Sequence, residues 1–372
     1  MSFFSPFSRF RRALLLSALA APTLAPAQAV RRGRALSFPR DHGAHLGART
    51  EWWYATGWLD DARLGFQVTF FRSRTGLAEP PAGASSRFAP RQLLFAHAAI
   101  TDVAAGRHWH DERIVRWSGD AASATARAAE TDADVHIGNW RLWREPEAAG
   151  TRTPARWLAR VAARGFTLDL TMTRTQPLLL QGDAGFSRKG PEEAQASHYY
   201  SEPQLDTRAR ISRDGRTLEA TGRAWIDQEW SDQILHPDAV GWDWIGMNLL
   251  DGSALTAFRL RRRDGSALWA GGSFRAPGAA SASFTAEAVR WSPGRRWRSP
   301  ATSADYPVGW RIDTPAGAFE VRALLDAQEL DSRGSTGAIY WEGLSELLDA
   351  QGRRVGVGYL EMTGYAAPLR LG

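Results

Sequence analysis

The sequence predicts an all-β protein made of two tandem antiparallel barrels with few short helices. Three observations favour this class: short apolar and aromatic runs divided by turn residues, little helical periodicity, and an internal repeat that spans both halves. Asp-Gly pairs at 214–215, 251–252 and 264–265 are typical of β-hairpin turns. The best candidates for short helices are the alanine-rich segment 279–288 and the segment 345–350.

Three segments of the first half align, in order, on three segments of the second half. Residues 51–71 align without gaps on 242–262, 198–202 on 339–343, and 222–227 on 356–361. Because three ordered matches rarely arise by chance, we expect two homologous domains, at about 36–235 and 236–372. Each would be an up-and-down barrel, which has no exposed sheet edge and can hold a small ligand in its mouth. A β-sandwich is the alternative architecture.

Residues 1–29 have the features of a cleaved export signal. Three arginines precede an apolar run, and Ala27-Gln28-Ala29 has the small residues of a signal-peptidase site. The mature chain would therefore begin at Val30 and work in the periplasm or outside the cell. The pair Arg11-Arg12 also permits twin-arginine export, so the sequence leaves the export route open.

Composition excludes several function classes. Removal of residues 1–29 takes away three arginines and no acidic residue, so the net charge falls from +6 to +3. The remaining positive charge is spread along the chain, which argues against nucleic acid as a partner. The chain has no cysteine, which excludes thiol catalysis, thiolate metal sites and a lipoprotein anchor. Its 17 tryptophans favour strands and apolar pockets.

Two common kinds of catalytic site find little support. Serine hydrolases carry G-x-S-x-G at a strand-to-helix turn, and the stretches at 185–190 and 343–347 lack that spacing. The histidine pairs His42/His45 and His108/His110 are too loose to select a metal, because a catalytic zinc site needs three ligands and an open position. We therefore predict neither a metal nor another cofactor.

The stretch RAWIDQEW at 223–230 contains the strongest candidate for chemistry. In a strand, alternation places Trp225, Asp227 and Glu229 on one face. The stretch HYYSE likewise places His198 and Tyr200 on one face. If the two strands are neighbours, His198, Tyr200, Trp225 and Asp227 would converge inside the first barrel. Aromatic rings would raise the pKa of the aspartic acid by desolvation and make it a general acid. An aspartate that closes a turn or pairs with an arginine is the alternative explanation.

Six stretches together resemble a known family: HLGARTEWWYATGWL, GDAGFSRKG, SHYYSEPQL, GRAWIDQEWSD, GWDWIGMNLLDGS and YWEGLSEL with GVGYLEMTGY. They are similar to the AttH-like proteins, also called predicted secreted hydrolases, which belong with the carotenoid 1,2-hydratases (hydroxyneurosporene synthases). The resemblance covers about residues 40 to 372. It implies two lipocalin-like barrels, in agreement with the internal repeat.

The resemblance also implies an activity and its residues. The carotenoid hydratases are hydro-lyases that add water to an isolated terminal double bond without a cofactor. Matched to their motifs, Asp227 would be the proton donor and His198 its assistant, while Tyr200 and Trp225 would hold the cation. Those enzymes have Trp and Tyr at the two aromatic positions, so the exchange here would reshape the pocket. A non-catalytic carrier, working with an ABC transporter of the lipoprotein-release type, is the alternative function.

Further residues are expected to bind a hydrophobic ligand of the isoprenoid, lipid or polyketide-like kind. These ligand-binding candidates are Glu51, Trp53, Trp244, Trp341, Tyr359 and Glu361. Glu361 aligns with Asp227, but Ile339 stands where the first half has His198. We therefore expect the second barrel to carry no acid chemistry and to serve either as a wall of the site or as a half that grips the ligand. The Gly-, Pro- and Ser-containing segment 181–197 is expected to be a long loop near the site.

Overall fold

The computed structural model describes residues 30–61, 63–76, 91–119, 123–147, 150 and 153–370, so the predicted export signal lies outside the described residues. Most of this part of the chain is β-strand. Its helices are two short 3₁₀ turns, η1 (Arg40–His42) and η2 (Ala286–Ala288). None of the described helices has the length and apolar character needed to cross a membrane. The predicted all-β class with few short helices is confirmed.

The first sheet is formed by the strands that precede residue 232. Among the described residues it has thirteen strands, and its main path runs β4-β3-β2-β1-β13-β12-β9-β8-β7-β6-β5. Two short strands, β10 and β11, pair with β12 outside this path. The strands are β1 (Thr50–Leu59), β2 (Leu64–Arg74), β3 (Gln92–Asp102), β4 (Arg107–Trp117), β5 (Ala126–Ala128), β6 (Asp134–Ile137), β7 (Trp140–Glu145), β8 (Arg156–Ala163), β9 (Phe166–Thr173), β10 (Leu179–Leu180), β11 (Phe186–Arg188), β12 (Ala196–Arg213) and β13 (Arg216–Ser231).

This sheet curls until its two ends approach each other and form a near-closed barrel. The Arg113 side chain on β4 donates hydrogen bonds to the carbonyl oxygens of Ile137 and Ala162, at 3.3 and 2.9 Å. These bonds join the end strand β4 to β6 and β8, on the far side of the sheet. The inward face is filled by a hydrophobic cluster that includes Trp53 and Trp157. The interior of this barrel is therefore packed with side chains.

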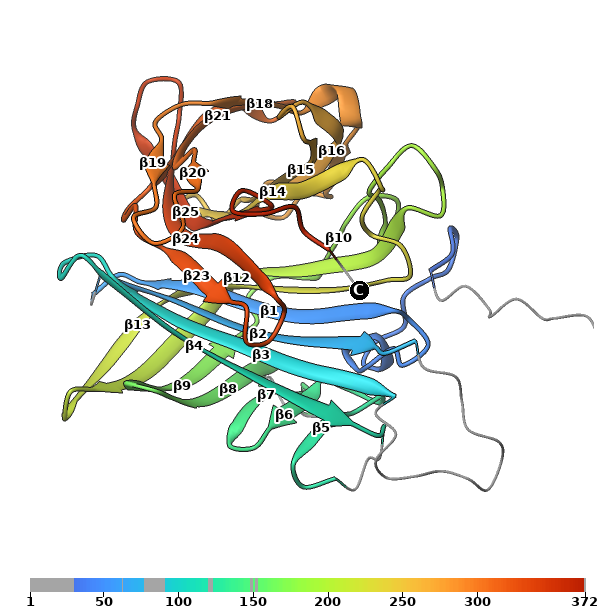
Figure 1. Ribbon diagram of the computed structural model, residues 1–372, viewed down its shortest axis with the longest axis vertical. Coiled ribbons are helices and arrows are strands. Elements are labelled where there is room, and N and C mark those ends of the chain that lie inside the picture. Colours follow the sequence, from blue (N-terminus) through green and yellow to red (C-terminus); the bar gives the residue numbers. More distant parts are fainter. Residues whose placement is uncertain are drawn as a thin grey trace, which may run out of the picture.

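The second sheet is formed by strands after residue 238 and encloses its own core. Its path runs β17-β16-β15-β14-β25-β24-β22-β21-β18, and β23 pairs with β24. Figure 1 shows it above the first sheet as a ring of strands. The strands are β14 (Ala239–Leu249), β15 (Ala254–Arg262), β16 (Ala267–Arg275), β17 (Ala282–Phe284), β18 (Arg290–Pro293), β21 (Gly309–Thr314), β22 (Gly317–Ala323), β23 (Glu329–Ser332), β24 (Ala338–Leu348) and β25 (Arg354–Thr363). A separate hairpin joins β19 (Trp297–Arg298) and β20 (Asp305–Tyr306).

The internal repeat corresponds to equivalent strands of the two sheets. The order β2-β1-β13-β12 in the first sheet is matched by β15-β14-β25-β24 in the second. The predicted Asp-Gly turns connect neighbouring strands, and Asp214 and Gly215 have φ angles of 51° and 73°. Positive φ at both central residues is the geometry of the tight hairpin turn that joins β12 to β13. The predicted helix at 345–350 is wrong, because residues up to 348 continue β24 between two partner strands.

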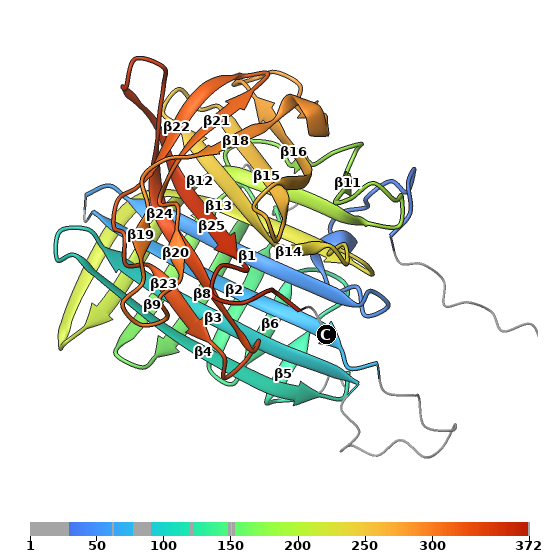
Figure 2. The same ribbon diagram turned by 45° about the horizontal axis from the view of Figure 1, so that its top comes forward.

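A third apolar layer lies between the two sheets. It contains aromatic side chains from the outer face of the first barrel and from the facing side of the second, among them Tyr54, Trp225, Trp244 and Tyr359. Figure 2 shows β14, β24 and β25 lying over β1 and β2. The two barrels thus bury one face of each against the other, and the interface rather than a barrel mouth holds the cavity described below.

Candidate active site between the two barrels

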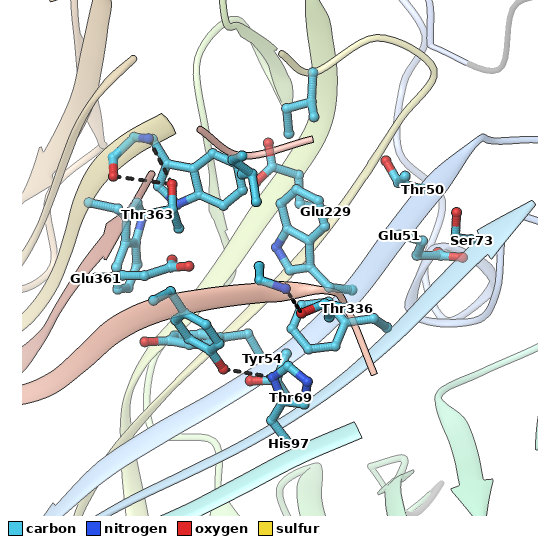
Figure 3. Close-up of a pocket in the computed structure, with 18 of the residues that line it drawn as sticks. Thr50, Glu51, Tyr54, Thr69, Ser73, His97, Glu229, Thr336, Glu361 and Thr363 are labelled. Carbon is cyan, nitrogen blue, oxygen red and sulfur yellow. Dashed lines mark hydrogen bonds between the residues drawn. The ribbon is translucent and has the colours of Figure 1, made fainter. Parts of the chain in front are cut away.

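A cavity with a volume of about 330 Å³ lies between the two barrels. The first barrel lines it with the outer faces of β1, β2, β3 and β13, and the second barrel with β14, β15, β24 and β25. Figure 3 shows Tyr54, His97, Glu229 and Glu361 around this space. Aromatic rings such as Trp244 and Phe258 form much of the wall, so the cavity is suited to an apolar molecule.

Asp227 reaches this cavity from the C-terminal half of β13. Its Oδ1 accepts hydrogen bonds from Ser201 Oγ at 2.6 Å and Trp225 Nε1 at 2.7 Å, and its Oδ2 accepts one from the Tyr199 hydroxyl at 2.7 Å. Trp244 Nε1 in turn donates to the Tyr199 oxygen at 3.1 Å. The carboxyl group is therefore held in one orientation by both barrels, and it is only 4% exposed.

Burial dominates the electrostatics of Asp227. Desolvation raises the pKa of its carboxyl from 3.8 to about 7, although the three donated hydrogen bonds act in the opposite direction. The negative charge of Glu229 adds to the increase in pKa. Since Oδ1 already accepts two hydrogen bonds, the proton of the neutral acid is best placed on Oδ2. Asp227 can therefore hold a transferable proton near neutral pH.

The second barrel adds two more carboxyl groups to the cavity. Glu342 on β24 and Glu361 on β25 are directly paired across the strands, so both project toward the same space. The Tyr54 hydroxyl of the first barrel donates a hydrogen bond to Glu342 Oε1. Burial raises the pKa of both carboxyls, and the charge of each neighbouring acid adds to this effect. Burial thus favours the neutral, protonated form of Asp227 on one side of the cavity and of Glu342 and Glu361 on the other.

One ion pair is also buried at the cavity wall. Lys189, the single lysine of the sequence, places Nζ 2.9 Å from Glu229 Oε1, and both side chains are at most 7% exposed. Lys189 belongs to the predicted loop 181–197, which folds back along β12 through the short strand β11. The expectation that this segment lies near the site is met. Nζ also lies 4.2 and 4.7 Å from the ring centroids of Phe258 and Tyr199.

A neutral histidine lies at the opposite side of the cavity. His97 on β3 forms hydrogen bonds with the Tyr340 hydroxyl at 2.7 Å and with Ser335 Oγ at 2.8 Å. Burial lowers the pKa of its imidazole to about 3, so the ring carries no charge near neutral pH. These contacts join the loop between β23 and β24 to the first barrel.

The structure does not bring together the four side chains that were expected to meet inside the first barrel, His198, Tyr200, Trp225 and Asp227. Ser201 is directly paired with Asp227, and Tyr200 with Gln228. His198 and Tyr200 therefore project inward, whereas Trp225 and Asp227 project outward to the cavity. The alternation predicted within each strand holds. The register between β12 and β13, however, places His198 and Tyr200 on the face opposite to that of Asp227. Tyr199 and Ser201 are the actual partners of Asp227.

The two inward residues belong to a packed hydrogen-bond network at one end of the first barrel. Tyr200 donates to Gln228 Oε1 at 2.5 Å and lies 2.6 Å from His42 Nδ1. His198 Nε2 accepts the backbone N–H of Arg31 at 3.3 Å, and burial lowers the pKa of His198 to about 4. Neither side chain lines the cavity between the barrels.

The remaining sequence candidates divide between the cavity and the barrel cores. Glu51 lies at the cavity edge, but its carboxylate is bound by Arg72 Nε at 3.0 Å and by His45 Nδ1 at 2.6 Å. Trp53 and Trp341 belong to the cores of the first and second barrels. Trp244 and Glu361 line the cavity, and Trp225 and Tyr359 pack in the layer around it.

Several residues of the site were not singled out in the sequence. They are Tyr54, His97, Lys189, Tyr199, Ser201, Tyr340 and Glu342. Tyr199, Ser201 and Glu342 lie within motifs that the sequence displays, so only their strand face was unknown. His97 gave no signal, because its role depends on contact between strands 243 residues apart. Among the described residues, no group of three or more His, Cys, Asp and Glu side chains is placed to hold a metal ion.

Comparisons with known proteins agree with this architecture. A crystal structure assigned to AttH from Nitrosomonas europaea has 45% identity and a TM-score of 0.81, and covers 92% of this chain and 100% of its own. Kievitone hydratase from Nectria haematococca has 13% identity and a TM-score of 0.65, over 90% and 94% of the two chains. CghA, solved with Sch210972, has 13% identity and a TM-score of 0.50, over 85% and 88%. The two distant likenesses show the fold alone.

No match was found among curated proteins. The family model described as AttH-like matches residues 29–365, which is most of the chain. The nearly complete alignment with the Nitrosomonas protein covers both barrels and supports the same assignment. The chain belongs to the AttH-like family.

Proposed function

We propose that this protein binds a hydrophobic unsaturated molecule between its barrels and that Asp227 protonates a carbon–carbon double bond of that molecule. Addition of water or a shift of the double bond would follow, without a cofactor. The observation that supports this proposal is a buried carboxyl group whose pKa of about 7 matches the requirement for a general acid near neutral pH. Aromatic walls on both sides complement an apolar substrate.

The proposed reaction follows from the hydrogen bonds of Asp227. The acid gives its Oδ2 proton to one alkene carbon, and a carbocation develops on the other. The resulting carboxylate is stabilised by the three donors that already hold it, Tyr199, Ser201 and Trp225. The π face of Trp244 at the cavity wall stabilises the positive charge. Water attack then gives an alcohol, whereas loss of a neighbouring proton gives an isomeric alkene.

Neutral carboxyl groups opposite Asp227 suit an apolar substrate. Protonated Glu342 and Glu361 can donate hydrogen bonds to an oxygen of the ligand, which would fix its position along the cavity. In this proposal the second barrel therefore grips the ligand, which is one of the two roles expected for it from the sequence. A structural relative named as a hydratase, kievitone hydratase, agrees with this chemistry, although its likeness to this chain concerns the fold.

A carrier of hydrophobic molecules is the second candidate function. The apolar cavity supports it as well as it supports catalysis, because carriage needs the cavity and not the acid. In that case we propose that the protein is exported through its N-terminal segment and exchanges its ligand with an ABC transporter of the lipoprotein-release type. Asp227 would then only fix a polar group of the cargo.

Incubation with kievitone, squalene and lycopene in labelled water tests the first proposal. We expect at least one of these alkenes to gain oxygen or deuterium from the solvent. In D227N, which keeps the shape of the side chain and removes the acidic proton, conversion should fall by about 100-fold or more while binding persists. Asp238→Asn, at an exposed position, is the matched control. Binding of the alkenes without conversion would contradict acid catalysis and favour the carrier.

A further inference from the structure

Glu229 has a different environment from the other cavity carboxyls. Glu342 and Glu361 face each other, and Asp227 has only neutral hydrogen-bond donors. Glu229 instead has a cationic partner, because Lys189 Nζ lies 2.9 Å from its Oε1. Carboxylate and ammonium groups at this distance form an ion pair. The cavity therefore contains both a neutral acid and a charged carboxylate.

The two oxygens of Glu229 are used differently. Oε1 accepts the Ser197 hydroxyl in addition to its ion pair with Lys189. Within the part of the chain that the structure describes, Oε2 has no hydrogen-bond partner, and Glu229 lines the cavity. One oxygen is thus fixed by the protein, and the other is free to accept a hydrogen bond from a molecule in the cavity.

Lys189 is held in place by its surroundings. Its Nζ lies 3.1 Å from Ser187 Oγ, and the rings of Phe258 and Tyr199 lie at 4.2 and 4.7 Å. A lysine side chain is flexible in water, and these contacts confine it to one position. The ammonium group therefore fixes the Glu229 carboxylate with little freedom.

Glu229 also lies next to the proposed acid. It follows Asp227 by two residues on β13, so both side chains project from the same face, as the sequence predicts. Tyr199 is the cross-strand partner of Glu229, and its hydroxyl donates to Asp227. The two carboxyl groups are thus adjacent along one wall, with one tyrosine between Lys189 and the acid.

We propose that Glu229 is the base that accepts a proton from the attacking water, and that Lys189 is the positioning residue for it. This inference rests on the proposed hydration of a double bond. Two carboxyl groups kept in different protonation states by their environments are a common arrangement for acid–base catalysis. Here burial supplies the acid, and the ion pair supplies the base.

The proposed hydration takes one proton from Asp227 and gives another to Glu229. The Asp227 proton forms a C–H bond with one alkene carbon, and the π electrons of the double bond are used in that bond. The water oxygen bonds to the cationic carbon and loses a proton to Glu229 Oε2. The substrate has gained one water molecule, Asp227 is a carboxylate, and Glu229 is a neutral acid. Return of that proton from Glu229 to Asp227 through water in the cavity restores the starting state.

The test compares variants with the alkene that the unmodified protein converts among kievitone, squalene and lycopene. Glu229→Gln removes the basic oxygen but leaves the Lys189 charge buried without a partner, which endangers folding. The double variant K189M/E229Q removes both charges with similar volume and avoids this problem. Lys189→Arg keeps the charge, and Glu320→Gln, at an exposed position on β22, is the control.

We expect K189M/E229Q to bind the alkene with a nearly unchanged KM and to lose about 100-fold or more in kcat for hydration. Lys189→Arg, which keeps Glu229 and a cation beside it, should retain more of the kcat than the double variant does. A loss confined to kcat is not expected of a purely structural ion pair. Full hydration by the folded double variant, with D227N inactive, would overturn the role of Glu229 and leave the proposed function intact. Full hydration by D227N, or no conversion by the unmodified protein, would overturn both.

Discussion

The D227N variant should change how the stability of the protein depends on pH. In the unfolded chain the Asp227 carboxyl ionises with a pKa near 3.8, whereas burial raises its pKa to about 7 in the folded protein. Between these two values the folded state binds a proton that the unfolded state has lost. Stability contributed by this group is therefore complete below 3.8 and decreases as the pH rises through this window.

The size of this effect follows from the two pKa values. One pKa unit corresponds to about 1.4 kcal/mol, so the difference between 3.8 and about 7 corresponds to about 4 kcal/mol. D227N cannot ionise and does not undergo this loss. From acidic to mildly alkaline pH, its free energy of unfolding should therefore increase relative to the unmodified protein by about 4 kcal/mol. Any constant effect of the amide on packing cancels in this comparison.

Urea unfolding at a series of pH values measures the difference directly. Tryptophan fluorescence reports the transition, and D227N is compared with the unmodified protein at each pH. A difference that does not vary with pH would show that the carboxyl group ionises normally in the folded state. The opposite sign, with the unmodified protein gaining stability as the pH rises, would show an aspartate stabilised as an ion. Either result would refute the argument from burial.

Three further changes test other parts of the structure. Trp225→Phe removes a hydrogen bond that stabilises ionised Asp227, so the pKa of Asp227 in a carboxyl titration should rise by about one unit. An unchanged pKa would show that this hydrogen bond does not stabilise the carboxylate. Arg72→Met leaves Glu51 buried without its cation, and urea unfolding should show a loss of about 3–5 kcal/mol; a neutral effect would mean that the network is dispensable. Gly222→Ala places a methyl group 1.9 Å from the carbonyl oxygen of Trp58 on β1. In the same assay the free energy of unfolding should fall by about 1–3 kcal/mol or more. An unchanged free energy of unfolding would show that β1 and β13 can move apart at this point.

The sequence was sufficient for the fold class and for the relation between the two halves. The repeat placed 51–71 and 242–262 in equivalent hairpins, and the structure shows them as β1–β2 and β14–β15. Alternation within RAWIDQEW put Trp225, Asp227 and Glu229 on one face, and all three lie on the outward face of β13. These features depend on local pattern, which a single sequence displays.

The location of the site could not be obtained in the same way. Which residue of β12 pairs with Asp227 is a property of two strands together, and a shift of one residue exchanges the faces of a strand. That exchange turned His198 and Tyr200 inward and brought Tyr199 and Ser201 to the acid. The place of the cavity between the barrels depends on how two complete sheets pack. Segment 345–350 was expected to be helical, but its residues up to 348 form the end of β24. Backbone pairing with β22 on one side and β25 on the other determines this conformation.

Titration of the Asp227 carboxyl in the folded protein tests the central claim most directly. Isotope-labelled aspartate gives a carboxyl signal for each residue in a nuclear magnetic resonance spectrum, and D227N identifies the one that belongs to Asp227. We predict a midpoint of about 7, because the carboxyl is buried between the barrels. A midpoint near the ordinary value of 3.8 would show a solvated, ionised aspartate and would contradict the proposed acid.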